Sequence, residues 1–173
     1  GQAICLPCVP GKYEDQEGQI TCKDCPQNAF TNETLQTSCH ICAAGQSTSG
    51  PGKTTCVACA AGKFKSSLST PCTACPQGWA RGADDASHTC TKCQEGQHQT
   101  QEGQAICLPC VPGKYENEQG RIMCKDCPEN TFTNETLQTS CHVCAAGQST
   151  TGSGKTTCTA CAAGKFKSSL STP

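Results

Sequence analysis

Large apolar side chains are scarce in this chain. Leu, Ile, Val and Phe together account for 19 of its 173 residues, and only 4% of the residues are aromatic. A chain of this length needs many more of them to build one ordinary hydrophobic core. Its 17 glycines and 10 prolines also disfavour long helices and long strands. Without cross-links we expect this sequence to remain unfolded.

Strong charge and long hydrophobic runs are missing as well. The net charge is −1, with acidic and basic residues interspersed, so nothing favours binding to nucleic acid or to an anionic membrane. No apolar run approaches the roughly 18 residues of a membrane-spanning helix, and we predict no membrane span within this segment. No secretory leader is visible. Because both ends fall inside repeats, we expect a fragment of a longer array.

Cysteine, by contrast, is abundant and regularly placed. All 20 cysteines occur in Cys-x-x-Cys pairs, and successive pairs begin 16 to 18 residues apart. A short, nearly fixed period predicts a linear array of small units. With so little apolar surface, the cysteines must supply the order. The ten pairs are Cys5/Cys8, Cys22/Cys25, Cys39/Cys42, Cys56/Cys59, Cys72/Cys75, Cys90/Cys93, Cys107/Cys110, Cys124/Cys127, Cys141/Cys144 and Cys158/Cys161.

A longer repeat lies above the short one. Residues 103–173 match residues 1–71 at 60 of 71 positions. We therefore predict one six-unit super-repeat over 1–102 and a partial second copy over 103–173. The sequence of residues 31–38 recurs unchanged at 133–140, whereas the acidic residues of 14–17 change places in the second copy. A cation site would keep its ligands in place, so we interpret that acidic segment as a solvated turn.

Two positions inside each unit carry structural information. The third residue after the second cysteine is glycine in eight units and asparagine (Asn28, Asn130) in two. These residue types adopt positive φ most easily, so we predict a left-handed residue there. The fifth residue after the second cysteine is aromatic in six units, and we expect each of these rings to cover a neighbouring disulfide. Ser47, His98 and Ser149 occupy this position in three other units. The rings are Tyr13, Phe30, Phe64, Tyr115, Phe132 and Phe166.

One unit departs from the pattern, because it is one residue longer and its ring, Trp79, lies one place early. We expect Trp79 to cover its own enlarged loop. The alternative is that it anchors a neighbouring chain.

The backbone of Cys-x-x-Cys decides which cysteines pair. In an extended strand residues i and i+3 face opposite sides, so one cysteine bonds backward and the other forward. In a helical turn they would share a face, as redox motifs and metal sites require. Prolines beside the pairs favour extended backbone. The simplest pairing then closes each loop: Cys8–Cys22, Cys25–Cys39, Cys42–Cys56, Cys59–Cys72, Cys75–Cys90, Cys93–Cys107, Cys110–Cys124, Cys127–Cys141 and Cys144–Cys158.

A crossed pairing remains open, because sequence alone does not fix disulfide connectivity. Its first two bonds would be Cys5–Cys22 and Cys8–Cys25. The residue four places before each pair nearly alternates between a small residue and leucine along the chain, which favours this double-unit alternative. In the loop-closing pairing, Cys5 and Cys161 find partners beyond this segment.

The stretch from Cys110 to Pro128 resembles a known module. A cysteine, two residues, a glycine, one residue and an aromatic ring precede a further Cys-x-x-Cys. This pattern is similar to the cysteine-rich repeats of tumour-necrosis-factor and ephrin receptor ectodomains. Long arrays of this kind resemble protist and algal surface proteins, including flagellar-hair (mastigoneme) proteins. The resemblance implies an extracellular rod of short hairpins, each loop closed by a disulfide, and carries over no ligand-binding residue.

Two N-glycosylation sequons occupy equivalent places 102 residues apart. They are Asn32-Glu33-Thr34 and Asn134-Glu135-Thr136. Two sequons in a cysteine-rich chain fit a secreted, glycosylated surface. We therefore predict covalent glycans at Asn32 and Asn134.

Two other uses of Cys-x-x-Cys fit this sequence less well. Structural zinc repeats would need five four-cysteine sites, with a basic surface or a globular domain that the sequence lacks. Redox chemistry needs one exposed thiol at a helix start, which ten similar pairs on irregular chain do not provide. The four histidines (His40, His88, His98 and His142) are expected to be exposed polar side chains.

The sequence thus predicts small disulfide-rich repeats: an elongated rod or solenoid of short β-hairpins and irregular loops, with little helix, no single large core and contacts only between neighbouring units. We expect an extracellular or cell-surface structural protein that self-associates with like chains into a filament, flagellar hair or surface coat. The alternatives are a ligand-binding or adhesive receptor-like ectodomain and, third, zinc-binding repeats. We expect no enzyme activity and no cofactor.

Overall fold

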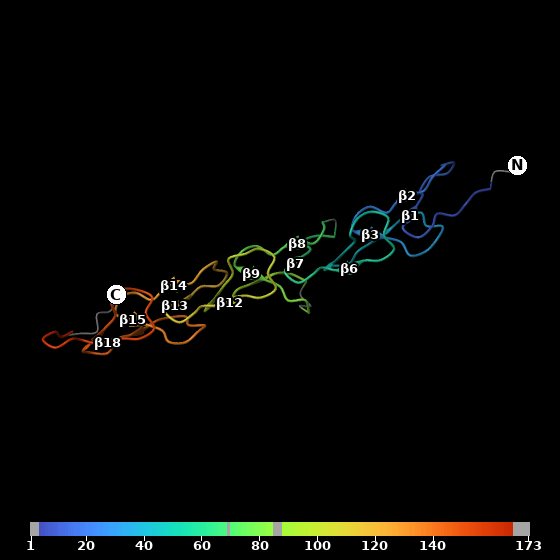
Figure 1. Ribbon diagram of the computed structural model, residues 1–173. Coiled ribbons are helices and arrows are strands. Elements are labelled where there is room, and N and C mark those ends of the chain that lie inside the picture. Colours follow the sequence, from blue (N-terminus) through green and yellow to red (C-terminus); the bar gives the residue numbers. More distant parts are fainter. Residues whose placement is uncertain (1–3, 69, 85–87, 168–173) are drawn as a thin grey trace. The chain divides into compact units, whose positions relative to one another are not determined.

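The computed structural model describes residues 4–68, 70–84 and 88–167 (Figure 1). These residues belong to two compact units, each of which is described by itself. The first consists of Gly1–Ala74 and Ala83–Thr89, and the second of Cys75–Gly82 and Cys90–Pro173. The super-repeat boundary at residues 102 and 103 is a property of the sequence and stays a prediction.

Each disulfide-closed loop is called a module here and is numbered in chain order. Module 1 runs from Cys8 to Cys22, and module 9 runs from Cys144 to Cys158. Every module takes part in an antiparallel hairpin, in which two residues near its start pair with the two residues that follow its closing cysteine, in the middle of the next Cys-x-x-Cys. The described part of the chain contains no helix. The extended Cys-x-x-Cys that the sequence predicted is therefore confirmed.

The strands are only two residues long because a module has room for little more between its cysteines. Consecutive strands pair with each other, β1 with β2 and so on to β17 with β18. Within the described ranges the strands are β1 (Lys12–Tyr13), β2 (Lys23–Asp24), β3 (Ala29–Phe30), β4 (His40–Ile41), β5 (Gln46–Ser47), β6 (Val57–Ala58), β7 (Lys63–Phe64), β8 (Thr73–Ala74), β9 (Trp79–Ala80), β10 (Thr91–Lys92), β11 (Gln97–His98), β12 (Leu108–Pro109), β13 (Lys114–Tyr115), β14 (Lys125–Asp126), β15 (Thr131–Phe132), β16 (His142–Val143), β17 (Gln148–Ser149) and β18 (Thr159–Ala160).

Nine disulfides close the nine modules. They are the nine loop-closing bonds expected from the sequence, from Cys8–Cys22 to Cys144–Cys158, and the paired Cα atoms lie 5.5 to 5.8 Å apart. The crossed pairing is wrong, because the extended backbone directs the two cysteines of a pair toward different modules. Cys5 and Cys161 have no disulfide partner among the described residues.

The left-handed residue predicted after each second cysteine is present in all ten places. Its φ ranges from 65° at Asn130 to 86° at Gly11. In module 1 the carbonyl of Gly11 accepts a hydrogen bond from the N–H of Cys25 at 2.9 Å, which closes the hairpin. The N–H of Gly11 donates to Thr31 of the next module at 2.8 Å. Both backbone groups of this turn residue are therefore bonded to module 2, at its opening cysteine and at its buried threonine.

Successive modules are joined by main-chain hydrogen bonds. Between modules 7 and 8, Gly113 N–H donates to Thr133 O at 2.9 Å and Glu116 N–H donates to Gln138 O at 3.1 Å. In the opposite direction, Leu137 N–H donates to Cys110 O at 3.0 Å. The same three bonds join modules 1 and 2 and modules 6 and 7. Because backbone groups make them, these contacts persist while the side chains vary.

Modules also contact their second neighbours, so the expectation of contacts between adjacent units alone is wrong. A Cβ atom on Gly11 of module 1 would stand 2.5 Å from the carbonyl oxygen of Gly52 in module 3. Gly113 of module 7 lies in the same way against the carbonyl oxygen of Gly154 in module 9. Glycine is required at these places for space as well as for its positive φ.

The interior of each module consists of sulfur and polar side chains. Its opening cysteine is at most 9% exposed in all nine modules. The only other buried apolar side chains among the described residues are Ala29 and Ala80. This confirms that no single large core exists. The sixth residue after the opening cysteine is polar and buried in eight modules: Thr31, Thr48, Lys65, Arg81, Gln99, Glu116, Thr133 and Thr150.

Module 4 has the shortest loop and replaces a backbone contact with a side chain. In modules 1, 2, 5, 6, 7 and 8 the carbonyl of the opening cysteine accepts a hydrogen bond from a turn N–H of the next module, as Cys25 O does from Gly52 at 2.8 Å. The carbonyl of Cys42 instead lies 3.4 Å from Nζ of Lys65, which also donates to Gln46 O at 3.0 Å. Burial lowers the pKa of the Lys65 ammonium.

Candidate functional site

The two sequon asparagines lie on exposed turns held at both ends. Asn32 follows buried Thr31, whose Oγ1 accepts a hydrogen bond from Glu33 N–H at 3.4 Å. Three residues later Leu35 has a φ of 61° and donates its N–H to Cys8 O of the preceding module at 3.0 Å. Asn134 is exposed on the equivalent turn. Both side chains therefore have the accessibility that an N-linked glycan needs.

Leu35 and its equivalent Leu137 adopt the left-handed conformation that glycine fills at the same place in other modules. Both leucine side chains are exposed, at 74% and 50%. The near-alternation of small residues and leucine in the sequence marks this turn and not a double-unit disulfide pattern.

The acidic turn of module 7 is stabilised by groups of its own chain. Glu116 is 1% exposed, and its Oε1 accepts hydrogen bonds from the N–H groups of Asn117 at 3.0 Å and Glu118 at 3.1 Å. Nζ of Lys125 lies 3.1 Å from the same oxygen, and this contact raises the pKa of the Lys125 ammonium. The carboxylate of Glu116 is thus satisfied by its own chain and is buried, so the expectation of a solvated turn is wrong for this residue and holds for the exposed residues 117–119.

Trp79 lies on the opposite face of its hairpin from the other rings. It pairs across the strands with Lys92, in the register that Lys12 and Asp24 occupy in module 1. Nζ of Lys92 lies 5.5 Å from the centre of the indole ring, a cation–π distance. Ala80 fills the usual ring position and is 5% exposed. Trp79 is half-buried, and its role toward another chain stays a prediction.

His98 is the histidine for which the sequence expectation is wrong. His40, His88 and His142 are exposed as expected, whereas His98 is half-buried on β11. Its Nδ1 atom lies 3.2 Å from Sγ of Cys124, the closing cysteine of module 7. A nitrogen of the ring and the sulfurs of Cys110 and Cys124 all lie within 4.8 Å of one another.

The side chains of this cluster belong to residue types that bind metals, but its two cysteines do not have free thiols. The sulfurs of Cys110 and Cys124 are joined in a disulfide, and a disulfide sulfur is not the thiolate that zinc binds. The same reasoning applies to all eighteen bonded cysteines. The pairing therefore contradicts a zinc-repeat interpretation of these Cys-x-x-Cys motifs.

A cavity of about 460 Å³ lies between modules 2 and 4. It is lined by Pro26, Gln27, Asn28, Ala29, Ile41 and Leu68. Asn28 occupies the position at which Gly11, Gly78, Gly96 and Gly113 lie against a turn two modules away, and Leu68 of module 4 lines the cavity. The asparagine thus marks a place where the second-neighbour approach is looser. Its N–H donates to Thr48 Oγ1 at 2.9 Å.

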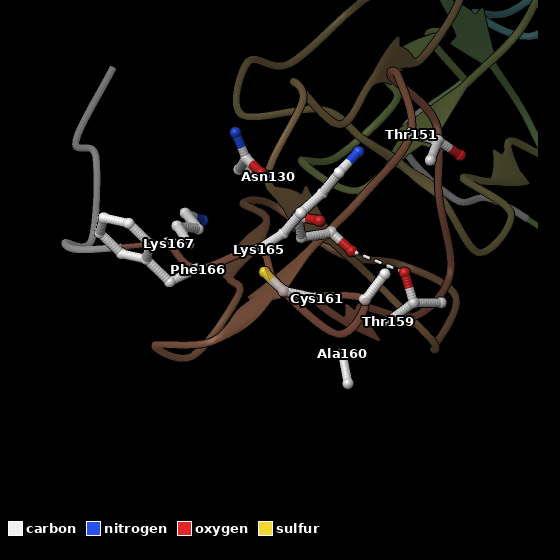
Figure 2. A pocket seen from close by; sticks show the side chains of 10 residues that line it. Asn130, Thr151, Thr159, Ala160, Cys161, Lys165, Phe166 and Lys167 are labelled. Atoms are coloured by element: carbon white, nitrogen blue, oxygen red, sulfur yellow. Dashed lines mark hydrogen bonds between the residues drawn. The ribbon is translucent and has the colours of Figure 1, made fainter.

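A second cavity of about 640 Å³ contains the thiol of Cys161 (Figure 2). Lys165, Phe166 and Asn130 line the same cavity, and Thr159 Oγ1 donates to Ser149 O at 3.1 Å beside it. Phe166 is 85% exposed, so the ring predicted as a lid does not cover a disulfide there. Cys5 is exposed.

The buried polar position is the feature that sequence reasoning missed. Its signal was present, because the sixth residue after each second cysteine is polar in every unit, including Glu14 and Lys167. Its hydrogen bonds explain the choice: Thr133 Oγ1 accepts from Gly113 N–H at 2.8 Å, and Gln99 Nε2 donates to Ile106 O at 2.9 Å. A buried polar group needs such partners.

Comparison with known proteins agrees with this architecture. Residues 1–38 match the family model described as tyrosine-protein kinase ephrin type A/B receptor-like. No curated protein matches the chain. The chain therefore consists of cysteine-rich repeats that resemble ephrin-receptor-like modules, and the match spans two of its ten Cys-x-x-Cys pairs.

The nine disulfides and this resemblance together indicate an extracellular receptor-like or structural domain, because disulfides of this density persist in oxidising compartments. Within the residues that the structure describes, no helix is long and apolar enough to cross a membrane.

Proposed function

We propose that this chain is a glycosylated extracellular structural repeat that associates with like chains into a filament, flagellar hair or surface coat. The observation that carries the proposal is a set of exposed apolar side chains that recurs after 102 residues. Six such positions are exposed and apolar in both copies: Ile4/Ile106, Leu6/Leu108, Val9/Val111, Ile20/Ile122, Leu35/Leu137 and Ile41/Val143.

Regular recurrence suits an assembly better than a single binding site. A filament presents the same contact at fixed intervals, so both copies of the contact must keep the same chemistry. Ile20 is 97% exposed and Ile122 is 44% exposed, yet both remain isoleucine although residues 15–17, 19 and 21 differ between the copies. Exposed apolar residues of this kind are typical of protein–protein contacts when they gather on one surface.

The proposal is tested by the association state of the disulfide-intact chain. Analytical ultracentrifugation and negative-stain electron microscopy should show regular oligomers or filaments at about micromolar concentration. The double variant Ile20→Ser/Ile122→Ser should dissociate them, whereas Thr37→Ser/Thr139→Ser, an exposed pair at the same spacing, should not. A wild-type chain that stays monomeric at about 100 times that concentration would contradict the proposal.

A receptor-like or adhesive ectodomain is the second candidate. It is favoured by the match of residues 1–38 to the ephrin-receptor-like model. Binding of a soluble partner by a monomeric chain would favour it over self-association. We expect no catalytic activity, no resident cofactor and no nucleic-acid partner in either case.

A further inference from the structure

We propose that His98 makes Cys110–Cys124 a thiol-exchange site, at which a small thiol is captured as a mixed disulfide on Cys124. The proposal starts from the 3.2 Å contact between Nδ1 of His98 and Sγ of Cys124. It does not depend on whether the chain assembles.

The place of His98 in the module explains the contact. His98 occupies the fifth position after an opening cysteine, which carries a ring in most other modules, and it precedes Cys124 by 26 residues. The same spacing relates Tyr115 to Cys141 and Phe132 to Cys158. Phenylalanine has no ionisable proton, and the tyrosine hydroxyl ionises only near pH 10. Of the three side chains, only the imidazole places a ring nitrogen that can carry a proton beside the sulfur.

The two sulfurs differ in access. Cys110 is 0% exposed, whereas Cys124 is half-buried and its neighbours Met123 and Lys125 are exposed. An entering thiolate therefore reaches Cys124 first. The sulfur that leaves is that of Cys110, in a buried place where an isolated thiolate is costly.

The step balances without an added oxidant or reductant. The sulfur of a low-molecular-mass thiolate attacks Sγ of Cys124 and forms a new S–S bond. The Cys110–Cys124 bond breaks, and its electron pair goes to Sγ of Cys110. The protonated imidazole of His98 then donates its proton to that sulfur, from which it lies within 4.8 Å. A leaving thiol that is stabilised in this way leaves faster.

The chain supplies a matched control in the next module. Cys127–Cys141 has the same distribution of exposure, with Cys127 0% exposed and Cys141 half-buried. It has Tyr115 where Cys110–Cys124 has His98. The two bonds close loops of the same length, with a sequence separation of 14.

The test uses the full chain and glutathione as the probe. After brief exposure, the reaction is quenched with acid, free thiols are alkylated, and adducts are located by peptide mapping. Cys110–Cys124 should open at least about tenfold faster than Cys127–Cys141, with glutathione on Cys124 and the alkyl group on Cys110. An adduct on Cys110, or equal rates at the two bonds, would overturn the proposal.

Two variants distinguish the effect of the His98 proton on the opening rate from the effect of the shape of the side chain. His98→Phe introduces the residue that modules 2 and 8 carry at this position, and His98→Gln keeps a hydrogen-bonding group that does not ionise. Both should slow opening of Cys110–Cys124 at least about tenfold and leave Cys127–Cys141 unchanged. If either correctly paired variant reacts as fast as the wild type, His98 is not the proton donor. Correct pairing is checked by the same peptide map before glutathione is added.

Discussion

The carbonyl oxygen of Gly52 lies 2.5 Å from the place that a Cβ atom on Gly11 would occupy. The two residues belong to modules 1 and 3, and only backbone atoms lie at the contact between them. This approach explains why the turn after the opening cysteine is so often glycine. Space and positive φ act together there, and they can be separated by experiment.

Gly11→Ala should destabilise the first unit more than Gly18→Ala. Both glycines have positive φ, 86° and 75°, but nothing lies within 4 Å of a Cβ on Gly18. Each alanine should lose about 1–2 kcal/mol from the left-handed conformation. Gly11→Ala should lose about 1–3 kcal/mol more from the clash with Gly52. Thermal unfolding with intact disulfides measures both; equal losses would show that crowding is unimportant.

Lys65→Met should destabilise the first unit by about 1–3 kcal/mol, because it removes the donor that satisfies the carbonyls of Cys42 and Gln46. Lys53→Met, at an exposed lysine of module 3, serves as the control and should change stability by less than about 0.5 kcal/mol. Urea unfolding measures both variants. Similar losses would mean that the Lys65 hydrogen bonds contribute little.

The same lysine predicts a pH dependence with a definite sign. Burial lowers the pKa of Lys65 in the folded chain from its usual value of 10.5. Between the lowered pKa and 10.5, the unfolded chain binds more protons than the folded one. The free energy of unfolding should therefore rise as pH increases through this window. Lys65→Met should remove that part of the rise, and urea midpoints measured with the two free thiols blocked would reveal it.

Expression through a secretory pathway should attach one N-glycan at Asn32 and one at Asn134, since both side chains are exposed on equivalent turns. Asn32→Gln and Asn134→Gln should each remove one glycan mass, and the double variant should remove both. Intact-mass spectrometry before and after amidase treatment makes the measurement. The exposed asparagine Asn117, which is not in a sequon, should remain unmodified; loss of glycan mass from its replacement by glutamine would show that the assignment is wrong.

Removal of one disulfide should have a local effect. Cys127→Ser/Cys141→Ser opens module 8 and should cost about 3 kcal/mol by the chain-entropy model. Because contacts reach the second neighbour, hydrogen exchange should increase in modules 6 to 9 and stay unchanged in modules 1 to 3. Loss of protection along the whole chain at once would contradict a series of locally stabilised modules.

The regular part of this fold was predictable from the sequence because it depends on residues with one dominant property. Cysteine spacing predicted the nine disulfides, and glycine or asparagine predicted the left-handed turns. The buried polar residues were harder to recognise. Thr31, Lys65 and Glu116 share no side-chain chemistry, and each is satisfied by a different partner. No apolar periodicity marks such a position.

The site at His98 was missed for a related reason. The sequence places His98 in a polar loop, and only the stacking of module 6 on module 7 brings its ring to Cys124. For Trp79, in contrast, the sequence does show the relevant feature, which is a shift of the ring by one position. Because side chains alternate along a strand, that shift places the ring on the other face of the hairpin.

Closure of every loop by sulfur has a mechanical consequence. A pull on the main chain passes from Cys25 across the bridge to Cys39 and then through two residues to Cys42, so the enclosed loop carries none of the load. Each bridge spans 5.5 to 5.8 Å between Cα atoms, against roughly 45 to 50 Å for the same loop fully stretched. Stretching the folded chain would strain covalent bonds before any loop lengthened. Opening one bridge would release several tens of ångströms of slack at a single point.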